Sequence, residues 1–208
     1  THPVRTGAAV ELVQPAILEF TTIDKNWRLQ PVGPATSEAG NVGDNYFTFE
    51  NDRPAAPAEV GGDVTLSGFN VLNYFNGDGL GGGFPTSRGA TTSLEFSRQA
   101  EKTVAALTAV NADVVGLMEI ENDGYGEQSA IIDLVGRLNA KLGAGTYQYV
   151  QVPGTTELGS DEITVGLLYK PSKVAPVGAA VTLNTGVFAF GNRQPLVQSF
   201  RQLSNNEV

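Results

Sequence analysis

Residues 113–119 read DVVGLME, a short apolar run that ends in a carboxylate. A run of this length without polar alternation is typical of a strand that is covered on both faces, as in sheets flanked by helices. Helical patterns lie on either side of it. Thr92 and Glu95 have the spacing of a capping box, and Ser129 begins a second helical pattern that ends at Gly143. The stretch therefore predicts an α/β arrangement around a buried central strand.

Further strand-like runs extend this pattern in both directions. The run Val64–Tyr74 is rich in β-forming residues and has no helical period. After the second helix come four more runs, Tyr147–Val152, Ile163–Tyr169, Val177–Leu183 and Leu196–Leu203. Strands that alternate with helices and then follow one another predict a layered α/β sandwich.

Residues 1–60 differ from the rest. The short strand-like runs Val10–Val13 and Ile17–Phe20 lie between turn formers, and Asp24–Pro31 reads as a hairpin edge or a turn. Gly40–Asp44 reads as a polar loop, and Asn51–Ala58 as a stiff, Pro-rich linker. We expect a small β-rich module over residues 1–60 and an α/β domain over residues 61–208.

The composition excludes several classes of protein. The chain has 208 residues, 41% hydrophobic and 17% charged, with a mean hydropathy of -0.08, as in a globular protein. No run of about 18 apolar residues is present, which excludes a transmembrane helix. Cysteine is absent and His2 is the one histidine, so disulfides, thiolate metal sites and an internal Ser-His-Asp triad are excluded within these residues.

The net charge of -9 comes from 13 Lys and Arg against 22 Asp and Glu. Such a field repels a polyanion, which argues against a simple basic groove for nucleic acid. It does not exclude an enzyme that holds phosphate through a divalent cation, because the ion inverts the local sign.

Glu119 and Asn70 are the first candidate site residues. Glu119 ends an apolar strand, where α/β proteins place ligands, and a carboxylate there is a natural ligand for Mg²⁺ or Ca²⁺. The alternative is that Glu119, Glu121 and Asp123 form a solvated acidic loop. Asn70 lies within a strand that disfavours asparagine, so it either caps a local turn or reaches a ligand. Alternation places Phe69, Val71 and Asn73 on one face and Asn70 on the other.

Four other charged side chains are further candidates. Arg88 ends the Gly-rich loop 76–89, which is too far from the next helix for a dinucleotide fingerprint. Asp161 and Glu162 precede a strand, where paired acids are commonly solvated. Arg193 precedes the strand at Leu196, and its guanidinium would suit phosphate. Arg88 is equally well read as a surface arginine, and a lone loop arginine such as Arg193 commonly has no functional role.

The ordered set of motifs resembles the endonuclease/exonuclease/phosphatase superfamily, with its DNase-I-like four-layer α/β sandwich. The motifs are FNVLNY (69–74), DVVGLMEIEND (113–123), SDEITVGLLYKPSKV (160–174) and NRQPLVQSF (192–200). The loop sequence SRGA (87–90) and the phrase LMEIEN are most similar to the bacterial extracellular nucleases of this superfamily. The resemblance covers residues 62–208, and residues 1–60 resemble the small module that often precedes the catalytic domain.

The resemblance implies a role for each candidate. Asn70 matches an asparagine that orients phosphate and metal, and Glu119 matches the glutamate that ligates the ion, Mg²⁺ or else Ca²⁺ or Mn²⁺. Asp161, with Glu162 as the alternative register, matches the carboxylate that orients a catalytic histidine. Arg193, with Arg88 as a second candidate, would bind the substrate. Some members carry an acid two positions after the first asparagine, where this chain has Leu72.

The chain corresponds to the first half of such a catalytic domain. The family's catalytic histidines, its Asp-x-Asn motif and its final Asp-His pair belong to the second half, and none has a counterpart here. We therefore expect the 208 residues alone to be inactive, and to be completed by a further C-terminal segment or a second chain, because an isolated half exposes one sheet face.

These implications lead to one preferred function and two alternatives. We expect a secreted, extracellular, metal-dependent phosphodiesterase that hydrolyses DNA or RNA. The alternatives are a phosphoesterase of the same fold that acts on phospholipids or inositol phosphates, and a non-catalytic binding module or pseudoenzyme.

Overall fold

The computed structural model describes residues 9–32, 47–49, 54 and 57–208. Its Cα positions group into two units, Thr1–Ala55 and Ala56–Val208. The loop predicted at Gly40–Asp44, most of the linker predicted at Asn51–Ala58 and His2 lie outside the described residues.

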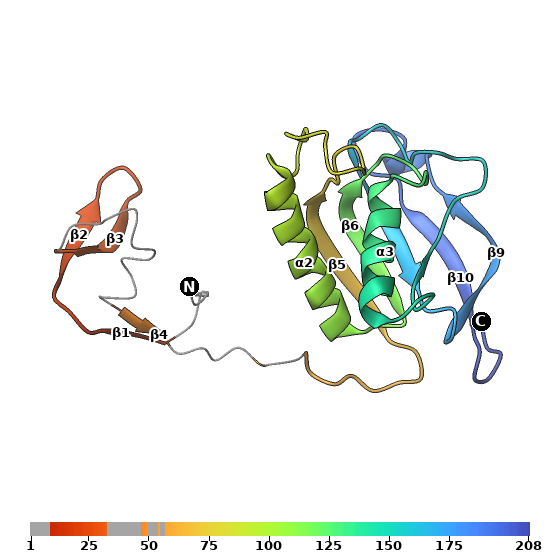
Figure 1. The fold of residues 1–208 in the computed structure, drawn as a ribbon, viewed down its shortest axis with the longest axis horizontal. Helices are drawn as coiled ribbons and strands as arrows, with labels where there is room; N and C mark the ends of the chain where they lie inside the picture. Colours follow the sequence, from red (N-terminus) through yellow and green to blue (C-terminus); the bar gives the residue numbers. More distant parts are fainter. Residues whose placement is uncertain (1–8, 33–46, 50–53, 55–56) are drawn as a thin grey trace. The chain divides into compact units, whose positions relative to one another are not determined.

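Within its described residues, the first unit contains two antiparallel strand pairs (Figure 1). Strand β1 (Val10–Leu12) pairs with β4 (Phe47–Phe49), and β2 (Ala16–Thr21) pairs with β3 (Asn26–Pro31) as a hairpin. The stretch 24–31 thus forms the turn and second strand of a hairpin. The hairpin is amphipathic: Glu19 pairs with Arg28 on one face, whereas Phe20 and Trp27 pack edge to face, 5.3 Å apart, on the other.

The second unit is built on a mixed four-stranded sheet in the order β5-β6-β8-β7. Strand β5 (Leu66–Tyr74) runs parallel to β6 (Val114–Glu121), and β8 (Ile163–Tyr169) runs antiparallel to β6 and to β7 (Gln148–Tyr149). The predicted strand at 113–119 is therefore β6, in the middle of the sheet. The strand predicted at Tyr147–Val152 is confirmed only over two residues.

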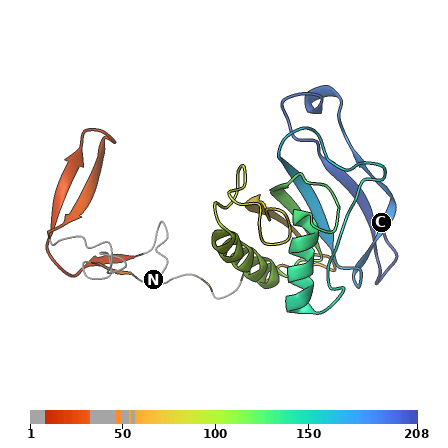
Figure 2. The same cartoon turned by 45° about the horizontal axis from the view of Figure 1, so that its top comes forward.

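Two helices cover one face of this sheet (Figures 1 and 2). They are α2 (Ser93–Val110) and α3 (Ala130–Leu142), and their apolar side chains share one core with residues of β5, β6 and β8. That core includes Phe96 and Leu107 of α2, Leu134 of α3, and Leu117 and Leu168 of the sheet. At about 0.8 kcal/mol per buried methylene, this apolar interface supplies much of the stability of the unit.

Both helices begin where the sequence predicts, although their caps differ. The Thr92 hydroxyl accepts a hydrogen bond from the Glu95 N–H, while the Glu95 carboxylate turns back to Thr91. Ser129 occupies the cap position of α3, but its hydroxyl makes no capping bond. Instead the Asp123 carboxylate accepts from the Ala130 N–H at 2.9 Å, so the cap comes from the preceding loop.

The other face of the sheet is partly covered by a hairpin of β9 (Val174–Thr182) and β10 (Leu196–Gln202). The hairpin packs in a second core against Val114 and Tyr169, whose ring lies 5.4 Å from that of Phe200. Helices, sheet and hairpin thus form successive layers, and the predicted α/β class is confirmed. The uncovered part of this face lies over β5, where Leu66 is 75% exposed.

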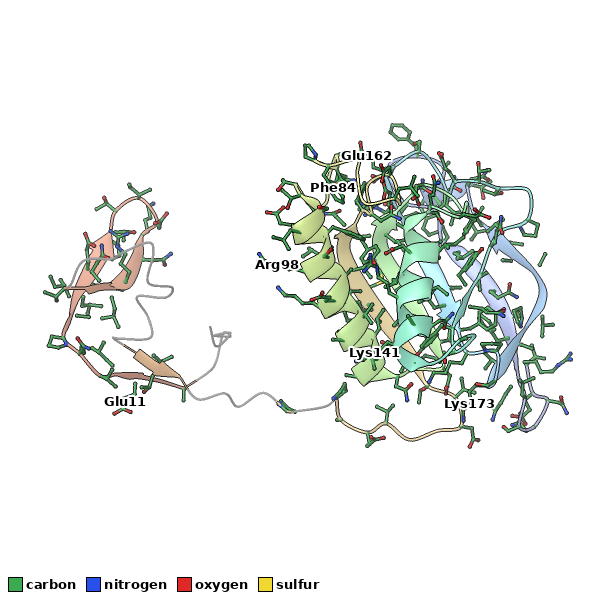
Figure 3. All side chains as sticks on the ribbon, viewed as in Figure 1. Glu11, Phe84, Arg98, Lys141, Glu162 and Lys173 are labelled. Atoms are coloured by element: carbon green, nitrogen blue, oxygen red, sulfur yellow. The ribbon has the colours of Figure 1, made fainter. Side chains whose placement is uncertain are left out.

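A buried polar cluster joins the N-terminal end of β6 to its neighbours. The Lys170 ammonium donates to the Asn111 carbonyl at 2.6 Å and lies 3.5 Å from Asp113. Asp113 in turn accepts hydrogen bonds of 3.0 Å from the Thr65 N–H and hydroxyl. This cluster links both neighbouring strands to β6 at the end where Lys173 is seen in Figure 3. In the described part of the chain, no helix has the length and apolar character needed to cross a membrane.

Candidate active site

The C-terminal ends of β5 and β6 are irregular at the same level of the sheet. Asn70 pairs with Met118 and Tyr74 pairs with Ile120, so residues 71–73 of β5 lie opposite a single residue of β6. That residue is Glu119, whose φ of 63° is left-handed. Left-handed φ is uncommon for residues other than glycine, and such strain is concentrated at functional sites. This end of the sheet is therefore the first candidate for a functional site.

The irregularity at Glu119 moves its side chain out of strict alternation. Leu117 and Ile120 both pack into the core beneath the helices, although residues on one face of a regular strand are separated by a single position. Met118 and Glu119 thus share the interval between them. Met118 is 40% exposed and Glu119 half-buried, so Glu119 is placed at the accessible edge rather than in the helix-side core.

Asn70 lies beside Glu119 on the neighbouring strand. Phe69 and Val71 pack toward the helices, so Asn70 faces the other side of the sheet and is exposed there, as the alternation predicts. The alternation ends before Asn73, because Leu72 and Asn73 are left-handed, with φ of 56° and 50°, and Tyr74 packs into the helix-side core after this bulge.

The Asn70 amide makes a local hydrogen bond. Its Oδ1 accepts from the Leu72 N–H at 2.7 Å, which is the local-turn alternative. An amide oxygen has a second lone pair, so this bond leaves the oxygen able to accept once more. The role of Asn70 toward phosphate or metal stays a prediction.

Arg88, Asp161 and Arg193 come together from three separate loops. The Arg88 guanidinium donates to Asp161 Oδ1 at 2.7 Å, and Arg193 lies 3.3 Å from Asp161 Oδ2. Glu162 lies 3.9 Å from Arg88. These residues line a cleft of about 760 Å³. The chain thus brings both predicted arginines to one carboxylate, with charged side chains that remain 40% or more exposed.

The carboxylate at the centre of this cluster is held in its charged form. Burial alone would raise the pKa of Asp161, but the Ile163 N–H and the charges of Arg193 and Arg88 hold it below its usual range. Asp161 is therefore ionised at neutral pH and available as an acceptor.

Hydrogen bonds from Asn122 tie this cluster to the end of β6. The Asn122 N–H donates to the Glu162 carbonyl and its side-chain amide donates to the Asp161 carbonyl, both at 2.9 Å. Glu162 is seen at the upper end of the sheet in Figure 3, at the opposite end from Lys141. Glu119 and the arginine cluster therefore lie at the same end, where the parallel strands β5 and β6 terminate.

Glu121, which the sequence assigned only to an acidic loop, is half-buried at the end of β6. Burial, followed by the charges of Asp123 and Glu162, raises its pKa to about 7, although the Asn76 N–H donates to it at 3.2 Å and opposes the shift. A carboxyl with a pKa near neutrality is typical of active sites. The sequence at 119–121, two glutamates separated by one residue, does not indicate that the carboxyl of Glu121 is buried.

A divalent cation at this end of the sheet would require oxygen donors. Among the described residues, no group of three acidic or histidine side chains forms a ready metal site. Glu119 supplies one accessible carboxylate. Mg²⁺ is commonly held by one or two carboxylates, with waters and substrate phosphate completing its shell. Glu119 thus fits such an ion, whose other ligands would come from outside these side chains.

Comparisons with known proteins show a weak likeness of fold. No family model and no curated protein matches the chain. Among solved structures, the human Nocturnin catalytic domain with bound sulfate anion, a domain of endonuclease/exonuclease/phosphatase-like fold, is similar with 15% identity and a TM-score of 0.41. The match covers 69% of this chain and 45% of that one, so this chain spans less than half of the Nocturnin domain. At these values no activity follows from the likeness, and the α/β class rests on the elements themselves.

Proposed function

We propose that this chain is part of a divalent-metal-dependent phosphodiesterase and that its substrate is DNA or RNA. The observation that carries the proposal is that Glu119 lies at the same end of the sheet as the cluster of Arg88, Asp161 and Arg193. The pattern of motifs in the sequence supports it, because it resembles secreted nucleases. The extracellular location is proposed on that resemblance alone.

Each residue has a distinct task in this proposal. Glu119 would hold the ion, and the bound ion would supply charge stabilisation at the phosphoryl oxygens. Arg88 and Arg193 present guanidinium groups, which bind phosphate through paired N–H donors. Asp161 accepts a hydrogen bond from Arg88 and forms an ion pair with Arg193, which fixes the orientation of both guanidinium groups. An ionised Asp161 would also orient a histidine supplied by another segment.

The proposal is tested by ion binding to the 208-residue chain. Mn²⁺ titration, followed by the electron-spin resonance signal of the free ion, is expected to show a site that Glu119→Gln removes. Glu101→Gln is the matched control, since it makes the same change of charge on the exposed surface of α2. Equal Mn²⁺ binding by wild type and Glu119→Gln would contradict the role of Glu119.

Nicking of plasmid DNA provides the second measurement. We expect the 208-residue chain to nick no DNA in Mg²⁺, because it offers no histidine in its described part to activate water. Hydrolysis by this chain would show that its own residues suffice.

A further inference from the structure

The loop between β9 and β10 presents an exposed aromatic ring at the cleft that holds the arginines. Phe190 is 93% exposed, and it lines the cleft together with Phe188, Arg88 and Arg193. Figure 2 shows this loop, with its short helix, at the tip of the β9–β10 hairpin. An exposed apolar ring in the same cleft as two guanidinium groups is complementary to a ligand that has both a flat apolar part and an anionic part.

The loop has a defined conformation that its own hydrogen bonds maintain. A short 3-10 helix, η1 (Gly186–Phe188), is followed by a bond from the Ala189 N–H to the Gly186 carbonyl at 3.2 Å. The Asn192 side chain donates to the Val187 carbonyl at 2.6 Å and closes the loop. Gly191, with φ of 75°, provides the left-handed step after Phe190. A loop backbone held in this way loses little conformational entropy when it binds a ligand.

Nucleic acid with unpaired bases has both required parts. Guanidinium groups bind its phosphates, and aromatic side chains stack on its bases, whose faces are accessible only when the strand is single. The volume of the cleft, about 760 Å³, lies within the range of roughly 300 to 1,000 Å³ that is usual for ligand pockets.

We infer that this cleft binds single-stranded nucleic acid, with Arg88 and Arg193 on the phosphates and Phe190 stacked on an adjacent base. The inference rests on the proposed function, since it names the substrate class of the same site. Phosphate would replace Asp161 and Glu162 as the acceptor for guanidinium N–H groups. The two arginines and these two acids have a net charge of zero, so the electrostatic attraction for phosphate is weak. The stacked base therefore contributes an essential part of the affinity.

The test is fluorescence anisotropy of a labelled single-stranded oligonucleotide, in EDTA so that no cleavage occurs. Phe190→Ala is expected to weaken binding at least about fivefold, the effect of losing one stacked base. Phe190→Leu, which keeps the apolar bulk but not the ring, should weaken it similarly. Val187→Ala is the matched control, because Val187 is 71% exposed on the same loop and does not line the cleft.

An abasic strand of equal length separates the base from the phosphates. It should bind more weakly than the normal strand and be insensitive to Phe190→Ala, and a duplex of the same sequence should also bind more weakly. Equal binding of normal and abasic strands, or no effect of Phe190→Ala, would overturn the inference. If such a result were found while Mn²⁺ binding still depended on Glu119, the inference would fail and the proposed function would stand. If Mn²⁺ binding did not depend on Glu119 either, the proposed function would fail as well.

A lipid surface is the competing ligand for an exposed phenylalanine. Co-sedimentation with vesicles of phosphatidylcholine and phosphatidylserine measures it directly. If Phe190→Ala abolished vesicle binding and left oligonucleotide binding unchanged, the loop would be a membrane-insertion loop and the inference would be wrong.

Discussion

Arg88 donates a 2.7 Å hydrogen bond to Asp161, which lies 73 residues further along the chain. Arg193 reaches the other oxygen of the same carboxylate from a third loop. Asp161 therefore both organises the two guanidinium groups and competes with any anion for them. The two effects can be separated by a substitution that keeps the shape of the side chain and removes its charge.

Asp161→Asn is expected to raise the affinity of the chain for a single-stranded oligonucleotide severalfold in EDTA. The reason is electrostatic, since the neutral amide no longer offsets the charges of Arg88 and Arg193, and exposed ion pairs contribute up to about 1 kcal/mol. Anisotropy at low and high salt measures the effect, which should shrink at high salt. Asp63→Asn, an equal change at an exposed position before β5, serves as control. A lower affinity of Asp161→Asn would show that the orienting effect dominates.

The Gly-rich loop 76–89 places Arg88, so its geometry is expected to matter for binding. Gly79 has φ of 70°, and a Cβ there would collide with the Gln128 carbonyl oxygen. Gly79→Ala should therefore displace the loop and weaken oligonucleotide binding. Gly81→Ala tests the specificity of this effect, because Gly81 also has positive φ, 96°, but has open space around its Cβ position. Equal effects of the two substitutions would show that backbone strain alone, rather than the contact with Gln128, is responsible.

The Asp113 cluster is expected to make stability depend on pH at the acid end. Burial would raise the pKa of Asp113, but hydrogen bonds from Thr65 and the charge of Lys170 hold it below the ordinary value of 3.8. A depressed pKa stabilises the native state above pH 3.8, and this contribution is lost as the pH falls through the native pKa.

Asp113→Asn should accordingly lower the melting temperature at pH 7, by the equivalent of about 2 kcal/mol. The difference in melting temperature between Asp113→Asn and the wild type should become smaller as the pH falls below about 4. Circular dichroism melts across this range provide the measurement. A gap that stays constant with pH would mean that packing, rather than charge, accounts for the loss.

The cap of α2 offers a smaller and independent test of stability. Thr92→Ala removes the acceptor for the Glu95 N–H and should destabilise the second unit by about 1 kcal/mol. Ser93→Ala, one residue further on and equally exposed, should have little effect. Urea denaturation of the two variants distinguishes them, and equal midpoints would rule out a capping contribution.

The sequence contained enough information for the elements but not for the details of the site. Thr92 and Glu95 predicted the start of α2 because a helix cap is a local sequence pattern. The run 113–119 predicted β6 because a strand that is buried on both faces appears in the sequence as an unbroken series of apolar residues. The bulge at Leu72 could not be predicted, since leucine has no preference for left-handed backbone and FNVLNY reads as a regular strand.

The arrangement around Asp161 was also beyond the sequence. Arg88 and Arg193 were named singly, but their meeting depends on how three loops are brought to one end of the sheet. Glu121 was missed for a similar reason. Its raised pKa comes from burial and from Asp123 and Glu162, which are features of the packed molecule.

The Lys170–Asp113–Thr65 cluster stands at the far end of the sheet from the cleft. The residues of the buried polar cluster and the residues proposed to bind the ligand thus lie at opposite ends of the sheet. Loop 183–195, most of which is exposed, should then be exchangeable for a loop of other sequence at little cost in folding, which would make this unit a framework on which new recognition surfaces can be grafted.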